Sequence, residues 1–183
     1  MKRMAFAAGM VVLVFAVSLR AQTAAPKPDP EFKKFDVFLG HWTYDGENKA
    51  GPFGPANRVS GEETGKRILG GFFLQSQFIE KGAMGETRGI EIVGYDPANK
   101  TFFSNEYFDN GTMASGAYVF NGSTVTYSGK FMVMGKPYMT KNTMIFAADS
   151  MSFTAKAEIS TDGKAWAPFF EGQFTKIKPA PKK

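Results

Sequence analysis

The residues that could carry out chemistry are few, and they exclude several classes of reaction. The chain of 183 residues contains one histidine, His41, and no cysteine. Catalytic zinc needs several histidines with a carboxylate, and thiol chemistry needs cysteine, so neither fits. A haem held by His41 is disfavoured, because this residue opens the first expected strand. We therefore predict no catalytic residue, no metal and no cofactor, although a hydrolase that pairs Glu91 with a second acid stays open.

Glu91 and Asn105 are the polar residues that the hairpin registers place on an apolar face. The sequence DPANK at 96–100 is typical of a tight turn, which would set Glu91 opposite Asn105 and Val93 opposite Phe103. An unpaired carboxylate on such a face would cost several kcal/mol or raise its pKa. We expect Glu91 to meet a hydrogen-bond donor, to lie at a wet rim or to contact a ligand.

Further turns extend the same face. Two-residue turns at 110–111 and 121–122 bring tyrosines beside this pair, and turns at 149–150 and 162–163 add rings from the last strands, including Trp166. Arg88 and Glu106 fall on the outer face in this register, as do Phe102 and Phe108. The predicted ligand-binding residues are Glu91, Tyr95, Phe103, Asn105, Tyr107, Tyr118, Tyr127, Phe153 and Phe170.

The elements that must position these residues are antiparallel strands. About ten segments of 7 to 12 residues with mostly short turns predict an all-β, up-and-down antiparallel β-barrel, because closure removes exposed edges. Ahead of them Phe32, Phe35 and Phe38 recur at a spacing of three after Asp29, and Gly40 would stop the turn. This pattern predicts a short N-terminal helical plug that closes one end of the barrel.

The ends of the chain predict export. A basic start and the apolar run 5–19 are typical of a signal peptide over 1–21, and the run is short for a retained membrane anchor, the weaker alternative. A linker is expected at 22–30, a single β-barrel domain at 31–177 and a basic Pro/Lys tail at 178–183. We therefore expect a periplasmic or secreted protein that has no membrane contact once the signal peptide is cleaved.

Charge argues against nucleic acid as a partner. The formal net charge of the chain is +5, but 8 of its 22 basic residues lie before Asp29 or after Thr175. The remaining 14 basic residues and all 17 acidic residues lie between Asp29 and Thr175, so the net charge of this part is −3. Phosphate binding needs lysine and arginine gathered on one surface, so no nucleic-acid face is predicted.

Several short motifs together resemble a known family. They are FLGHW (38–42), GPFGP (51–55), LGGFFL (69–74), GYDP (94–97) and STDGK (160–164). In this order and spacing they resemble the bacterial domain-of-unknown-function family 1579 over nearly the whole mature chain. The resemblance implies an exported, lipocalin-like, calycin-type barrel, and it brings no site residues with it.

The leading functional hypothesis is a lipocalin-like barrel of unknown physiological role that binds a small, mostly apolar ligand in its interior. Glu91 and Asn105 would orient that ligand. The first alternative is a filled structural or interaction barrel without a ligand, whose outer rings Phe102 and Phe108 meet a partner. The second is the carboxylate-based hydrolase. Strand number does not decide between a hollow and a filled barrel.

Overall fold

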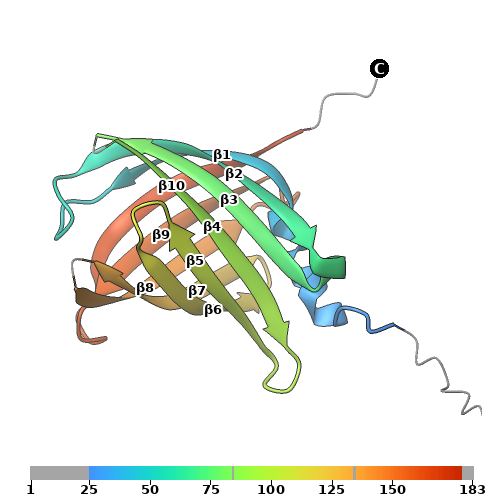
Figure 1. Ribbon diagram of the computed structural model, residues 1–183. Helices are drawn as coiled ribbons and strands as arrows, with labels where there is room; N and C mark the ends of the chain where they lie inside the picture. The colour runs from blue at the N-terminus through green and yellow to red at the C-terminus, as the bar shows by residue number, and fades with distance from the viewer. Residues whose placement is uncertain (1–24, 84, 134, 179–183) are drawn as a thin grey trace, which may run out of the picture.

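The computed structural model describes residues 25–83, 85–133 and 135–178, and Figure 1 gives its ribbon. Ten strands follow one another along the chain with short connections. They are β1 (Gly40–Asn48), β2 (Asn57–Ile68), β3 (Phe73–Gly82), β4 (Gly85–Asp96), β5 (Thr101–Phe108), β6 (Met113–Asn121), β7 (Thr124–Val133), β8 (Lys136–Phe146), β9 (Ser152–Ser160) and β10 (Ala167–Ile177).

The strands form one closed antiparallel barrel. Each strand pairs with its neighbour in the sequence, and β1 closes the circle against β10, with His41 opposite Ile177. Closure leaves no strand of this sheet with an unpaired edge. The predicted up-and-down, lipocalin-like barrel of about ten strands is thus confirmed.

A short helix fills one end of the barrel. The 3₁₀ helix η1 (Pro30–Phe38) begins after Asp29, whose carboxylate accepts a hydrogen bond of 2.9 Å from the Glu31 amide. Figure 1 shows it, in blue, at the end of the barrel opposite the loop that joins β1 to β2. Arg67 fastens it to β2 through hydrogen bonds to the Phe32 carbonyl (2.6 Å) and the Asp36 carboxylate (2.7 Å).

The hydrophobic core lies between this helix and the barrel wall. Phe35 is 1 % exposed, and its ring lies 5.0 to 5.6 Å from those of Phe32, Phe38, Phe102, Tyr118 and Phe120. Phe38 continues the cluster toward Phe146 and Phe153. The three phenylalanines of η1 therefore fill this end of the barrel with rings.

The other end of the barrel carries a smaller aromatic cluster from a loop. Phe53, in the segment between β1 and β2, lies 5.0 Å from Tyr138, 5.5 Å from Phe169 and 6.0 Å from Phe131, measured between ring centroids. This end is thus covered in part by one loop ring, whereas the opposite end is filled by a helix.

The faces of β5 differ from the expectation. Asp96 pairs with Thr101, so the turn has four residues, and Lys100 takes the left-handed conformation with φ 54°. Glu91 therefore lies opposite Glu106, and Val93 opposite Ser104. The slip of one residue turns Phe103, Asn105 and Tyr107 to the outer face, and it turns Phe102, Glu106 and Phe108 inward, so all six assignments were wrong.

The predicted signal peptide, 1–21, lies outside the described residues, as do residues 22–24 of the linker and 179–183 of the tail. Within the described part, no helix is long and apolar enough to span a bilayer.

Candidate functional site

A belt of polar side chains crosses the inner wall of the barrel, next to the aromatic core. We call it the polar belt, and its members come from seven successive strands. They are Glu63 on β2, Ser76 on β3, Glu91 on β4, Ser104 and Glu106 on β5, Tyr118 on β6, Tyr127 on β7 and Asn142 on β8.

Strand alternation gives the belt its position. In β4 and β5, glycine, valine or phenylalanine share the inner face with Glu91, Ser104 and Glu106, because every second residue points inward. Glu91 and Glu106 are direct cross-strand partners in this register. Two like charges that lie opposite each other repel, so the pair favours a state in which one carboxyl keeps its proton.

Glu91 is a strongly perturbed carboxyl of the belt. Its Oε1 accepts a hydrogen bond of 2.7 Å from the Tyr118 hydroxyl. Burial, with a smaller contribution from the nearby Glu106, raises the pKa of Glu91 to about 8, and the Tyr118 hydrogen bond opposes the shift. At neutral pH, Glu91 is thus held largely in its protonated form.

Three polar atoms of the belt lack a hydrogen-bond partner of good geometry within the protein. They are Ser104 Oγ, Tyr127 Oη and Asn142 Oδ1. Ser104 is 2 % and Tyr127 5 % exposed, so solvent on the outside of the barrel cannot satisfy them. Buried polar side chains nearly always have partners, which makes three such atoms in one layer unusual.

The other inward glutamates follow the same pattern of one hydroxyl donor for each carboxyl. Glu63 accepts a hydrogen bond from Ser76, and Glu80 accepts one of 3.1 Å from Tyr44. Burial raises the pKa of both carboxyl groups, and these hydrogen bonds oppose the rise. Burial likewise raises the pKa of Glu106.

Glycines in the wall allow rings to lie against the backbone. The Tyr127 ring occupies the space that a Cβ would need at Gly116 and Gly129, and the Phe170 ring does so at Gly46 and Gly172. Rings seated in this way take less of the central space than rings above larger residues. All four inward glutamates, although enclosed by strands, keep partly accessible surface.

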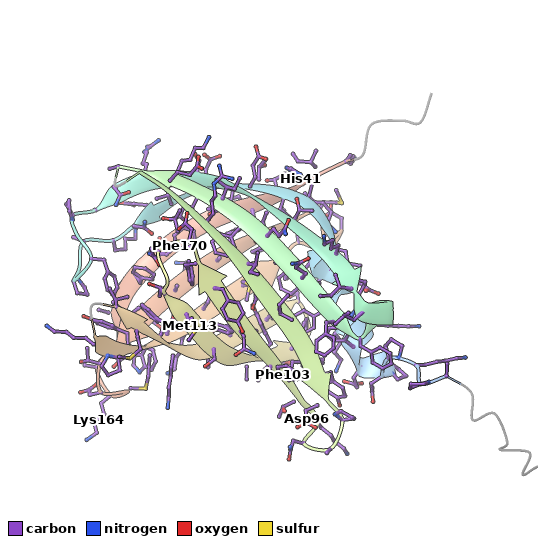
Figure 2. The ribbon with its side chains drawn as sticks, viewed as in Figure 1. His41, Asp96, Phe103, Met113, Lys164 and Phe170 are labelled. Carbon is purple, nitrogen blue, oxygen red and sulfur yellow. The ribbon has the colours of Figure 1, made fainter. Side chains whose placement is uncertain are left out.

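The structure divides the nine predicted site residues into three groups. Glu91, Tyr118 and Tyr127 lie in the polar belt, and Phe170 faces inward nearer the end that Phe53 covers. Tyr95 and Phe153 also point inward, but they pack in the core beside η1. The outward group is Phe103, Asn105 and Tyr107, with Phe103 37 % and Tyr107 45 % exposed. Figure 2 marks Phe103 on β5 and Phe170 on β10.

The interior glutamates Glu63, Glu80 and Glu106 were missed from the sequence. Glu62 and Glu63 are adjacent, so one of them must face inward whichever register holds. That signal was available for Glu63. Glu106 was missed because its face depends on the length of the turn at 97–100, which has four residues.

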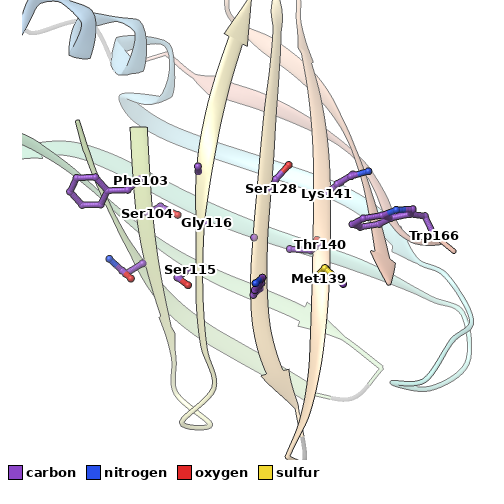
Figure 3. A pocket seen from close by; sticks show the side chains of 13 residues that line it. Phe103, Ser104, Ser115, Gly116, Ser128, Met139, Thr140, Lys141 and Trp166 are labelled. Carbon is purple, nitrogen blue, oxygen red and sulfur yellow. The ribbon is translucent and has the colours of Figure 1, made fainter. Parts of the chain in front are cut away.

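A shallow groove lies on the outer wall, on the far side of the same strands. It runs across β5 to β8 with a volume of about 560 Å³, and Figure 3 shows Phe103 at one margin and Trp166 with Lys141 at the other. The Lys141 ammonium lies 3.9 Å from the centre of the Trp166 ring. Trp166 was expected inside, but the β9–β10 register pairs Ile159 with Ala167 instead, which leaves Trp166 before the strand.

The only histidine of the sequence, His41, lies on the outside of the barrel. His41 faces outward on β1, with its Nε2 3.4 Å from an exposed Glu62 carboxylate. In the described part of the chain, no group of three or more His, Cys, Asp or Glu side chains could hold a metal ion.

Three solved structures resemble this chain at 12 % sequence identity or less. The crystal structure of Rv2717c from M. tuberculosis superposes with a TM-score of 0.60 at 12 % identity, covering 83 % of this chain and 100 % of that chain. The S-type phycobiliprotein lyase CPES from Guillardia theta gives 0.49 at 9 % identity, with 82 % and 93 % covered. A de novo designed fluorescence-activating β-barrel gives 0.40 at 12 % identity, with 78 % and 95 % covered.

At these identities, and with only Rv2717c of the three above a TM-score of 0.5, the likeness shows the fold alone. A search among curated proteins finds no match. The sequence model of the family described as "Protein of unknown function (DUF1579)" matches residues 27–176, which cover η1 and nearly all of the barrel. The chain therefore belongs to the DUF1579 family.

Proposed function

We propose that this protein binds a small, mostly apolar molecule inside the barrel, with the polar belt orienting it. The observation that carries the proposal is the group of three enclosed polar atoms without a hydrogen-bond partner of good geometry, Ser104 Oγ, Tyr127 Oη and Asn142 Oδ1. The Ser104 and Tyr127 hydroxyls lie near the Glu91 and Glu106 carboxyls, but not in good hydrogen-bond geometry. A ligand with a polar group at this depth would satisfy them, and its apolar part would lie against the rings of Phe78, Phe108 and Phe131.

The two ends of the barrel support one direction of access. Helix η1 and its ring cluster fill one end, and Arg67 fastens the helix to the wall. The opposite end carries the single loop ring Phe53 over Phe131 and Tyr138. The ligand would enter past Phe53. The apolar leader at 1–21 supports the further proposal that the protein acts after export, in the periplasm or as a secreted protein.

A matched pair of substitutions on β6 tests where binding occurs. Ala114 faces the interior and is 9 % exposed, whereas Ala117 faces the outer groove. The probe is N-phenyl-1-naphthylamine, an uncharged aromatic molecule whose fluorescence rises in apolar surroundings. We expect saturable binding to the native protein, at least about tenfold weaker binding to Ala114→Trp, and unchanged binding to Ala117→Trp.

The outcomes separate the candidate sites. Loss of binding in Ala117→Trp alone would place the probe in the outer groove and reject the interior site. Native affinity in both variants, or no saturable binding to the native protein, would reject it too. Circular dichroism and the unfolding midpoint of each variant check that the barrel has formed, so that a misfolded Ala114→Trp is replaced by Ala114→Leu.

A further inference from the structure

The interior of the barrel holds acids without matching bases. Glu63, Glu80, Glu91 and Glu106 all point inward. Arg67 and Lys176 reach the inside of the barrel at its closed end, where both bind groups of η1. Arg67 binds the Phe32 carbonyl and Asp36, and Lys176 donates to the Val37 carbonyl (3.2 Å) and lies 4.8 Å from the Trp42 ring centre.

Among the described residues, no lysine, arginine or histidine forms an ion pair with any of these four glutamates. An ionised carboxylate in an enclosed site without an opposite charge is costly, which is why burial raises the pKa of these four carboxyl groups. The arrangement therefore favours a positively charged guest.

The unpaired atoms of the belt point to the same chemistry. A carboxylate oxygen and the Asn142 carbonyl oxygen only accept hydrogen bonds, whereas the Ser104 and Tyr127 hydroxyls both donate and accept them. A ligand with N–H donors can therefore satisfy Asn142, the carboxylates and both hydroxyls. The Tyr118 and Tyr127 rings lie 5.0 Å apart between centroids, and the Tyr118 hydroxyl donates to Glu91. Aromatic faces attract organic cations.

A metal ion fits this site poorly. No group of three or more ligating side chains is close enough together among the described residues to hold one. Aromatic rings also occupy much of the surface around the belt. An organic cation can meet one or two carboxylates and several rings at once.

We propose that the interior site takes an organic ammonium ion, with its nitrogen held by Glu91 and Glu106 and its apolar part lying toward Phe78, Phe108 and Phe131. This inference rests on the proposed function, since it names the chemical class of the ligand in the same interior site. Glu91 and Glu106 are the best placed of the four carboxyls, because they face each other and adjoin the unpaired Ser104 and Tyr127 hydroxyls.

Proton release should accompany binding. The titratable groups that face Glu91 are Glu63 from β2, Glu106 from β5, Tyr118 from β6 and Tyr127 from β7. Burial raises the pKa of all of them, and none can supply a positive charge, because carboxyl and phenol groups are either neutral or negative. An ammonium ion stabilises the ionised form of Glu91, whose pKa of about 8 in the free protein must fall on binding.

The test compares three ligands of one chain length and different charge: decylammonium, decanol and decanoate, measured by isothermal titration calorimetry at about pH 8.5. We expect decylammonium to bind at least about tenfold more tightly than decanol, and decanoate to bind most weakly. The affinity of decylammonium should fall by about tenfold between about pH 8 and about pH 6, because the ligand stays charged over this range while Glu91 takes up a proton. The affinity of decanol should not change.

Isosteric variants assign the effect to the belt. Glu91→Gln should lose most of the preference for decylammonium over decanol, and Glu91→Gln with Glu106→Gln should lose all of it. Glu158→Gln is the matched control, because Glu158 is exposed on the outer face of β9. It should behave as the native protein does.

Failure of this inference differs from failure of the proposed function. Equal or tighter binding of decanol or decanoate to the native protein would overturn the ammonium site, while N-phenyl-1-naphthylamine binding blocked by Ala114→Trp would still support an interior ligand. An undiminished ammonium preference in the double Gln variant would also overturn it. Absence of binding by all four probes would reject both proposals.

Discussion

At the scale of single residues, the most informative feature is a carboxyl group that the fold keeps protonated. Glu91 lies opposite Glu106 and accepts a hydrogen bond from Tyr118. Its pKa in the folded protein is about 8, against about 4.3 in an unfolded chain. Between these two values, the unfolded chain has lost a proton that the folded barrel still holds.

This difference predicts how stability depends on pH. Because the unfolded state binds fewer protons between about pH 4.3 and about pH 8, the free energy of unfolding should fall as pH rises through that window. In Glu91→Gln the fall should be clearly smaller, since the amide does not titrate. Urea unfolding at about pH 5, 6, 7 and 8 measures it, with Glu158→Gln as control. A slope in Glu91→Gln equal to that of the native protein would contradict the assignment.

At the scale of elements, η1 contributes to the core as much as a strand does. Phe35 is 1 % exposed and meets five other rings, although η1 contains only nine residues. A helix this short is marginal by itself, so its stability comes from packing in the barrel. The helix and the barrel should then unfold together.

A comparison of two phenylalanines tests this role. Phe35→Ala should lower the free energy of unfolding by about 3–5 kcal/mol, because it leaves a cavity among rings. Phe103→Ala on the outer face, where the side chain is 37 % exposed, should cost about 1 kcal/mol. Guanidinium unfolding followed by tryptophan fluorescence measures both. Similar small losses in the two variants would mean that η1 is only a leader.

The sequence predicted which strands and helix form better than it predicted which side chains of a strand point inward. Spacing and turn residues were sufficient for the ten strands, for the closed barrel and for η1, since each depends on local patterns. The face of β5 depends on one residue in a turn, where Lys100 adopts the left-handed conformation that asparagine or glycine usually takes. Glu91, Tyr118 and Tyr127 were placed inward correctly, whereas Phe103, Asn105 and Tyr107 were not.

At the scale of the whole molecule, the pairing of the first strand with the last makes the barrel a single cooperative unit. Strand pairing continues around all ten strands, with one register shift in β10 between Pro168 and Phe170, and β1 and β10 are matched over eight residue pairs from His41 to Asn48. If any strand is removed, two long edges appear at once, and each offers unpaired N–H and C=O groups. Partial barrels of this chain should therefore associate rather than remain folded monomers.

Deletion of β10 tests that expectation. A chain that ends at Trp166 should lose cooperative unfolding and form aggregates, because β1 and β9 both become edges. A chain that ends at Ile177 keeps every strand, and its unfolding midpoint should match that of the full chain. Size-exclusion chromatography and thermal unfolding measure both. A monomeric, cooperatively unfolding chain without β10 would contradict the role of closure.

The contact between β1 and β10 also sets an order of events in time. His41 must find Ile177 across 136 positions of the sequence (177 − 41), a separation that makes loop closure slow relative to the formation of each hairpin. While the chain is being synthesised, β1 has only β2 beside it until the last strand has been completed. During that interval Glu91 is exposed to water and is free to ionise. Final closure must return a proton to it, because its pKa in the closed barrel is about 8, so refolding should become slower as pH rises.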